Sequence, residues 1–255
     1  MSPDLNGRLL GRTAVVTGST SGIGAGIARA LAAEGAHVLV TGRDEERGAK
    51  VVAEIEAAGG RADFVAADLG LGAEAIRALA ARVGELLGGA PDVLVNNAAQ
   101  LIPATRTQDT DEATVASALA VSVAAPFLLT RELVPGMVAR GSGAVVNIGS
   151  INGLVGMAGA ALYSATKAAV HALTKAWAAE FGPAGVRVNT VAPGPTRTEW
   201  NERHRDLLAG MVAGIPARRL STVEEVAAAV VFLASDEASN IHGATLPVDG
   251  GFTTV

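Results

Sequence analysis

The most constraining feature of the sequence is a regular alternation between short runs rich in β-branched residues and longer stretches rich in Ala, Leu and Glu. The short runs lack polar–apolar alternation, which is typical of parallel strands covered on both faces. Seven runs are predicted as strands: residues 13–17, 37–41, 62–66, 92–95, 144–148, 187–191 and 244–248. Six stretches are predicted as helices: residues 23–34, 45–58, 73–87, 111–138, 162–181 and 223–234. This order predicts an α/β fold with a doubly wound, parallel, seven-stranded sheet and helices on both faces.

A length of 255 residues fits one α/β domain, since folds of this class often reach that size undivided. Apolar residues make up 49% of the chain and charged residues 18%, a balance that supports a large core and excludes a disordered chain. No repeat or linker interrupts the alternation. We therefore expect a single domain over residues 1–255, with a small lid at about 196–215.

The composition argues against several functions. Aromatic residues amount to only 3% and the net charge is −5, so a nucleic-acid binder is not expected. The chain has no cysteine, which excludes disulfides, thiolate nucleophiles and iron–sulfur clusters. Its histidines, His37, His171, His204 and His242, are scattered and predict structural or surface positions rather than a metal site.

Two uncharged segments, 113–130 and 141–166, are candidates for membrane spans. The first contains Ser, Thr and Pro, and the second is rich in Gly and polar residues, so neither is the continuous apolar run that a bilayer requires. The N-terminal residues show no apolar stretch of the kind found in a secretory signal. We expect buried elements, no membrane association and a cytoplasmic location.

A glycine-rich segment, TGSTSGIG at residues 17–24, lies between the first predicted strand and the first helix. Its spacing is GxxxGxG rather than the GxGxxG of the usual dinucleotide fingerprint. Gly18 would permit a sharp turn, and Gly22 and Gly24 would let backbone N–H groups approach a pyrophosphate at the positive end of the helix. An ordinary strand–helix turn would contain the same glycines, so this segment alone does not decide between the two.

Further candidate residues follow the third and fourth predicted strands. Asp68 and Leu69 come after the third strand, and Asn96 and Asn97 come after the fourth. Ligands bind at the carboxyl ends of the strands in doubly wound sheets, so we expect these residues near the glycine-rich segment.

Tyr163 and Lys167 are four residues apart and project from one face of a helix. A neighbouring ammonium would favour the phenolate and lower the pKa of Tyr163, which could then exchange a proton with an alcohol or carbonyl oxygen. Ser150 follows the fifth predicted strand, where its hydroxyl could reach the same oxygen. Ser164 and Lys167 also match the S-x-x-K pattern of serine acylases, but the companion motifs of that class are missing.

Six motifs follow one another along the chain: TGSTSGIG at 17–24, NNAA at 96–99, Ser150, YSATK at 163–167, PGPTRT at 193–198 and VDGG at 248–251. Together they resemble the classical short-chain dehydrogenase/reductase family, over about residues 8–253. The resemblance implies a Rossmann-type fold and an oxidoreductase that interconverts a ketone and a secondary alcohol with NAD(P)(H).

The resemblance also implies roles for individual residues. Ser150 would position the substrate and Tyr163 would transfer the proton. Lys167 would bind the nicotinamide ribose and, together with the positive charge of the oxidised nicotinamide, lower the pKa of the tyrosine. The implied cofactor-binding residues are Gly18, Ser21, Gly22, Ile23, Gly24, Arg43, Asp68, Leu69, Asn97, Tyr163, Lys167, Pro193, Gly194, Thr196 and Thr198. No metal is expected.

The end of the second predicted strand bears on the choice of cofactor. Family members that prefer NAD commonly have an acid there to hold the ribose 2′-hydroxyl, whereas this chain has Gly42 followed by Arg43. A guanidinium can pair with a 2′-phosphate, so NADP(H) is favoured and NAD(H) is the alternative. Asp44 would be the adenosine acid if the strand ended two residues later.

The substrate pocket is expected to be mostly apolar, which suggests an uncharged or weakly polar ketone. The residues expected to flank it are Leu101, Ile102, Ile151, Asn152, Met157, Trp200 and His204. The favoured function is an NADPH-dependent carbonyl or 3-oxoacyl-type reductase. The alternatives are an NAD-dependent alcohol, sugar or steroid dehydrogenase, and a catalytically silent dinucleotide-binding regulator.

The resemblance further implies a homotetramer or homodimer formed through the Ala-rich segments 113–130 and 168–179.

One position departs from the family. Members usually carry an asparagine in a stretch resembling V-N-V-x-x-P-F, and here Ser122 takes its place in VSVAAPF at residues 121–127. In the family the backbone carbonyl of that residue holds a water that leads to the catalytic lysine. Pro126 has no N–H to donate to the carbonyl of residue 122, so we expect a bent helix and a freed carbonyl whatever the side chain at 122.

Overall fold

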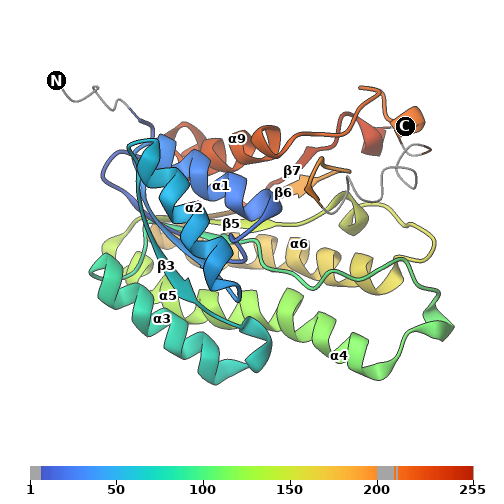
Figure 1. The fold of residues 1–255 in the computed structure, drawn as a ribbon, viewed down its shortest axis with the longest axis horizontal. Helices are drawn as coiled ribbons and strands as arrows, with labels where there is room; N and C mark the ends of the chain where they lie inside the picture. Colours follow the sequence, from blue (N-terminus) through green and yellow to red (C-terminus); the bar gives the residue numbers. More distant parts are fainter. Residues whose placement is uncertain (1–6, 200–209, 211, 255) are drawn as a thin grey trace.

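The computed structural model describes residues 7–199, 210 and 212–254, and the seven predicted strands are confirmed (Figure 1). They are β1 (Thr13–Val16), β2 (His37–Gly42), β3 (Arg61–Ala66), β4 (Val93–Asn96), β5 (Gly143–Ile148), β6 (Val186–Pro193) and β7 (Thr245–Val248). All pair in parallel, in the order β3-β2-β1-β4-β5-β6-β7. The strand order reverses between β1 and β4, the point at which doubly wound sheets bind ligands.

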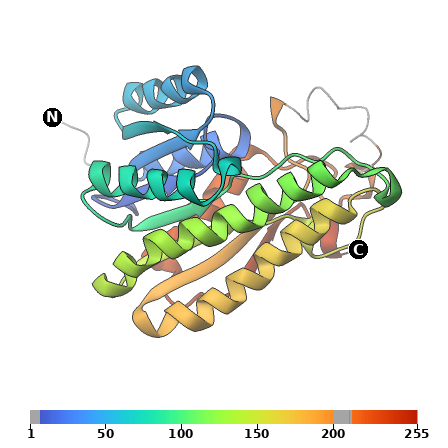
Figure 2. The same cartoon turned by 90° about the horizontal axis from the view of Figure 1, so that it is seen from below.

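Helices cover both faces of the sheet, as predicted. One face carries α1 (Gly22–Ala33), α2 (Glu45–Ala57) and α9 (Val223–Ala234), and the other carries α3 (Ala73–Leu87), α5 (Ala125–Arg140) and α6 (Ala161–Phe181). Figure 2 shows α5 and α6 running side by side over their face. Each face has its own apolar core, with Ile27 and Leu31 fully buried on one side and Leu129 and Met137 on the other.

The predicted helix at 111–138 is not one regular α-helix. It consists of α4 (Glu112–Leu119), a π-helical turn η3 (Ala120–Ala124) and α5. Within the turn, the Ala125 N–H donates to the carbonyl of Ala120, five residues back instead of four. Pro126 follows directly and has no N–H to continue the α-helical pattern, so the break falls where the sequence predicts one.

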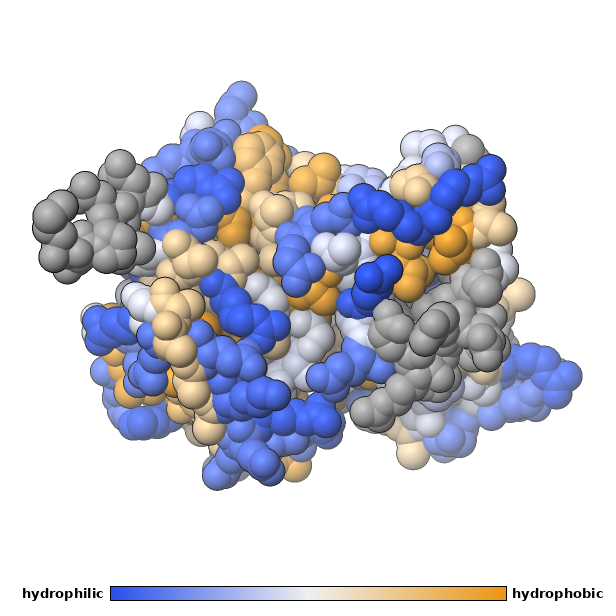
Figure 3. Space-filling model, turned by 45° about the horizontal axis from the view of Figure 1, so that its top comes forward, coloured by the Kyte–Doolittle hydropathy of each residue, from blue (hydrophilic) through white to orange (hydrophobic). Residues whose placement is uncertain are grey.

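The continuous helical segment 112–140 is long and apolar enough, by length and composition, to cross a membrane. One third of its most apolar window is buried in the fold, where it packs on the sheet and beside α3 and α6. Part of the apolar side chains of this segment therefore cover the sheet, while Leu119 and Phe127 stay 46% exposed. The face of the molecule in Figure 3 is mostly hydrophilic, with apolar residues in smaller patches between the charged ones.

Candidate active site

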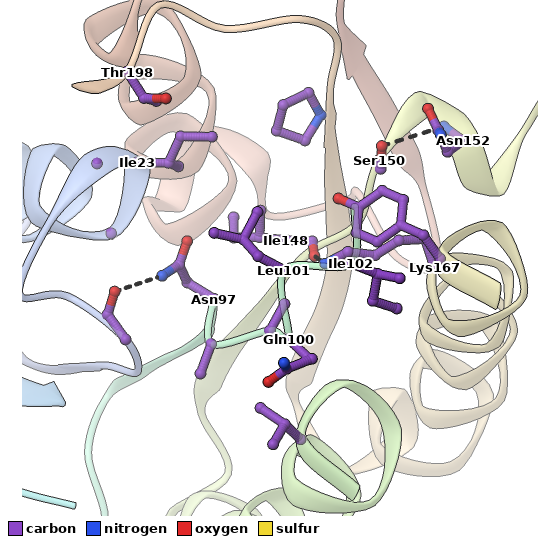
Figure 4. Close-up of a pocket in the computed structure, with 18 of the residues that line it drawn as sticks. Ile23, Asn97, Gln100, Leu101, Ile102, Ile148, Ser150, Asn152, Lys167 and Thr198 are labelled. Atoms are coloured by element: carbon purple, nitrogen blue, oxygen red, sulfur yellow. Dashed lines mark hydrogen bonds between the residues drawn. The ribbon is translucent and has the colours of Figure 1, made fainter. Parts of the chain in front are cut away.

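A cleft of about 790 Å³ opens at the carboxyl ends of the strands. All residues predicted as catalytic or cofactor-binding line this cleft, from Gly18 to Thr198. Figure 4 shows some of them, including Asn97, Ser150 and Lys167. The predicted pocket residues Leu101, Ile102, Ile151, Asn152 and Met157 line it as well. Trp200, His204 and most of the predicted lid at 196–215 lie outside the described residues.

The glycine-rich segment between β1 and α1 is packed tightly on the end of β4. Asn97 Nδ2 donates to the carbonyls of Thr17 at 2.8 Å and Gly18 at 3.0 Å. Gly18 has a φ of 61°, and a Cβ at residue 24 would lie 2.4 Å from Asn97 Nδ2. Both glycines are therefore required by the local geometry, because a side chain would be strained at one position and would collide at the other.

The first turn of α1 is open to an anion. Ser21 is the N-cap residue but its side chain makes no capping hydrogen bond, whereas α2, α4 and α9 are capped by Asp44, Asp111 and Thr222. Ser21 and the first residues of α1 line the cleft. Backbone N–H groups at the positive end of a helix bind phosphates, so the residues present fit the pyrophosphate of a dinucleotide.

Residues at the carboxyl end of β2 also line the cleft. Arg43 is exposed, lines the cleft and has no ion-pair partner among the described residues. A Cβ at residue 42 would lie 2.6 Å from Thr20 Cγ2, so a side chain at this position would require the Thr20 side chain to move. Asp44 accepts from the Arg47 N–H at 3.0 Å and caps α2, which gives it a local structural role.

Ser150, Tyr163 and Lys167 come together where β5 ends beside α6. Ser150 has an extended backbone just after β5, and its hydroxyl accepts from the Asn152 N–H at 3.2 Å. Lys167 Nζ donates to the carbonyl of Ile148 at 2.9 Å and lies 5.7 Å from the centre of the Tyr163 ring.

A chain of buried polar side chains fixes α6 on the sheet beneath these residues. Asn96 Nδ2 donates to Asn147 Oδ1 at 2.9 Å, and Asn147 Nδ2 donates to Thr174 Oγ1 at 2.7 Å. The hydroxyls of Thr174 and Thr190 are 2.6 Å apart. Because these hydrogen bonds link β4, β5, β6 and α6, they hold the helix that carries Tyr163 in register with the strand that precedes Ser150.

Burial dominates the electrostatics of the site. It lowers the pKa of Lys167 to about 8. It also raises the pKa of Tyr163, and a hydrogen bond with Ser150 only partly opposes this. Without cofactor, the Lys167 ammonium donates to the Ile148 carbonyl and burial outweighs the Ser150 hydrogen bond at Tyr163. The lowering of the Tyr163 pKa by Lys167 together with an oxidised nicotinamide stays a prediction for the protein with cofactor bound.

The part of the cleft beyond Tyr163 is lined mainly by apolar side chains. Figure 4 shows Leu101 and Ile102 between Asn97 and Lys167. The Thr105 N–H donates to the carbonyl of Gly159 at 2.8 Å, which joins the loop after β4 to the loop before α6. Among the described lining residues, the charged side chains are Arg43, Arg47, Asp68, Lys167 and Glu199.

Several lining residues were not predicted from the sequence, notably Thr20 and Gln100. The Gln100 N–H donates to the Ser122 hydroxyl at 3.0 Å, so the buried Ser122 ties the loop after β4 to the π-helical turn. No spacing in the sequence signals this contact, since the two residues belong to different elements. Within the described ranges, no three His, Asp or Glu side chains gather as they would in a metal site.

Comparison with known proteins gives matches over nearly the whole chain. A family model described as enoyl-(acyl carrier protein) reductase matches residues 18–253. A cis-4-hydroxycyclohexanecarboxylate dehydrogenase of Sinomonas cyclohexanicum is 42% identical over 96% of this chain and 97% of its own length. A solved structure described as a short chain dehydrogenase/reductase family protein is 46% identical, covers 97% of this chain and 100% of its own, and has a TM-score of 0.89. A structure of 3-oxoacyl (acyl-carrier-protein) reductase from Agrobacterium tumefaciens C58 with NADP bound is 37% identical, covers 98% and 97%, and has a TM-score of 0.90.

Proposed function

The chain belongs to the short-chain dehydrogenase/reductase family, oxidoreductases that act on alcohols and ketones, and we propose that it is an NADP(H)-dependent reductase of an uncharged ketone. The observation that carries the proposal is the convergence of Ser150, Tyr163 and Lys167 in the cleft that also holds the uncapped start of α1. A dinucleotide-binding regulator without chemistry would not need these three side chains together.

Each of the three residues has a distinct role in the proposed reduction. The nicotinamide cofactor, when bound, supplies the hydride to the carbonyl carbon. Tyr163 gives its phenolic proton to the carbonyl oxygen, and the Ser150 hydroxyl holds that oxygen by a hydrogen bond. Lys167 binds the nicotinamide ribose, and its ammonium stabilises the phenolate that Tyr163 becomes.

The residues at the end of β2 favour NADP(H) over NAD(H). Arg43 lines the cleft without an ion-pair partner among the described residues, so its guanidinium is free to pair with a 2′-phosphate. Gly42 offers no carboxylate to hold a ribose 2′-hydroxyl or to repel a 2′-phosphate. Asp44 is engaged as the cap of α2, which argues against that role for it.

The apolar part of the cleft favours a substrate without a formal charge. Leu101, Ile102, Ile151 and Met157 offer hydrocarbon surface, and a carboxylate placed against them would lose hydration without gaining a counter-charge from the described lining residues of that part. The relative from Sinomonas cyclohexanicum is named for a substrate that carries a carboxylate. The test must therefore compare ketones that differ only in the charge of the substrate.

The assembly that fits best is a homodimer or homotetramer built on the α5–α6 face. Phe127 of α5 is 46% exposed and its ring contacts Trp177 of α6 at 5.9 Å between centroids. Leu119, the last residue of α4 and directly before η3, is equally exposed. A second copy would cover this apolar surface. We propose a cytoplasmic location for this assembly.

A matched set of ketones tests the function and its two refinements together. The purified protein is assayed with NADPH and with NADH on cyclohexanone, 4-oxocyclohexanecarboxylate and the methyl ester of that acid. We expect oxidation of NADPH in preference to NADH, with kcat/KM at least tenfold higher for the ester than for the acid. Failure to reduce any ketone would contradict the reductase assignment, whereas a preference for NADH or for the acid would overturn only the corresponding refinement.

A further inference from the structure

Two glycines flank Ser150 and both lie against the ring of His171. A Cβ at residue 149 would be 2.2 Å from His171 Nε2, and a Cβ at residue 153 would be 2.7 Å from His171 Cε1. Neither glycine has a positive φ, so their backbones do not require glycine. The glycines are instead required because the ring occupies the space that a side chain would need.

The His171 ring is buried without the hydrogen bonds that a buried histidine usually makes. It is 5% exposed, and neither Nδ1 nor Nε2 has a hydrogen-bond partner among the described residues. Burial and the charge of Lys167 lower the pKa of His171, and a contact with the Gly153 backbone, whose geometry is too poor for a hydrogen bond, opposes this in part. Unpaired buried nitrogens cost stability, and an apolar residue here would avoid that cost.

The place of His171 in the fold gives the ring a role. It follows Lys167 by one turn of α6, so Tyr163, Lys167 and His171 project from the same helical face. On its other side, the turn that carries Ser150 is held by hydrogen bonds from the Gly149 N–H to Val191 O at 2.8 Å and from the Gly153 N–H to Ser150 O at 3.0 Å. The turn at 149–153 is therefore held by these hydrogen bonds and contacts the His171 ring.

We propose that His171 is a positioning residue for the reaction: its ring is the surface on which the 149–153 turn rests, and it sets the position of the Ser150 hydroxyl relative to Tyr163. The inference rests on the proposed function, because it assigns to His171 an effect that acts only through Ser150. A planar ring can contact two glycine backbones closely, and a smaller side chain would let the turn settle toward α6.

A double-mutant cycle tests whether His171 acts through Ser150. The kcat for ketone reduction, the Kd for NADPH and the thermal midpoint are measured for Ser150→Ala, His171→Ala and the double variant. We expect His171→Ala to lower kcat at least tenfold with the Kd changed less than threefold. In the Ser150→Ala background the same substitution should change kcat less than twofold, because the hydroxyl that it positions is already gone.

Val170→Ala is the matched control, since Val170 is a buried neighbour on the same helix with an exposure of 6%. Its effect on kcat should multiply with that of Ser150→Ala, as expected for independent sites. Retention of kcat within twofold in His171→Ala, or multiplication of its loss with that of Ser150→Ala, would overturn the inference. If Ser150→Ala itself kept wild-type kcat, the proposed function would fail first, so the two failures are distinguishable.

A second variant tests the same contact from the other side and does not depend on the folding of His171→Ala. Gly149→Ala places a methyl group against the His171 ring, with Thr190 Cγ2 the next nearest side-chain atom at 2.7 Å. We expect Gly149→Ala to lower kcat at least tenfold, again with no further effect of this substitution in the Ser150→Ala background. Where both single variants fold, adding His171→Ala should restore part of the loss, and a double variant worse than either parent would contradict the proposed contact.

Discussion

Lys167 donates a hydrogen bond of 2.9 Å to the carbonyl of Ile148, and this bond holds a buried ammonium beside the Tyr163 ring. The lysine is only 4% exposed, and burial lowers its pKa to about 8. The difference from the ordinary pKa of 10.5 corresponds to about 3 kcal/mol, so the charged lysine lowers the free energy of unfolding of the protein without cofactor by about that amount.

Lys167→Met should therefore stabilise the protein without cofactor while impairing activity. We expect the free energy of unfolding to rise by about 2 kcal/mol at pH 7, because the unpaired Ile148 carbonyl offsets part of the gain. Between pH 8 and 10.5 the folded wild type has lost the proton that the unfolded chain still binds, so wild-type stability rises with pH and the advantage of the variant shrinks. Urea unfolding of both proteins from pH 7 to pH 10 measures this, and a constant difference would contradict it.

Arg43→Ala should weaken the binding of NADPH and leave that of NADH nearly unchanged. A hydrogen-bonded charge pair with the 2′-phosphate contributes about 1.5–3 kcal/mol, and NADH has no such phosphate. Calorimetric titration with both cofactors provides the comparison. Arg29→Ala is the control, because Arg29 pairs with Glu54 on α2 and does not line the cleft. Equal losses for both cofactors would show that Arg43 has a structural role instead.

Ser122→Asn should change kcat by less than about tenfold, or about 1.4 kcal/mol. The water relay that the family resemblance implies uses the backbone carbonyl of residue 122, and the π-helical turn that contains this residue is followed by Pro126, which has no N–H to donate to that carbonyl. Pro126→Ala, which restores an N–H, should be the more harmful of the two because it lets the α-helical pattern close. Steady-state kinetics of both variants decide, and an inactive wild type rescued by Ser122→Asn would refute the account.

The fold was predictable because its signals are local. Apolar runs of strand length alternate with helical stretches, so the seven strands appear within two residues of their predicted bounds. The glycine-rich segment, NNAA, Ser150 and PGPTRT could be expected at one site because they lie at the carboxyl ends of β1, β4, β5 and β6, which parallel pairing brings to one edge of the sheet. The YSATK motif reaches the same cleft from α6 instead.

The rest depends on contacts between distant segments, which the sequence does not display. Pro126 predicts a break in the helix but not its π-helical form. His171 was expected to be a structural or surface residue, and its contacts with Gly149 and Gly153 emerge only when β5 and α6 are packed together. The raised pKa of Tyr163 likewise follows from burial in the folded protein.

The most direct test of the account is the kcat of Tyr163→Phe in ketone reduction with NADPH, measured together with its Kd for NADPH. The variant keeps the ring and removes the oxygen from which the proton is transferred. We predict a loss of at least about a hundredfold in kcat with the Kd unchanged within threefold, the behaviour of a general acid that the cofactor does not need for binding. A Tyr163→Phe protein that binds NADPH normally and reduces the ketone at the wild-type rate would contradict the assignment of Tyr163 as the proton donor.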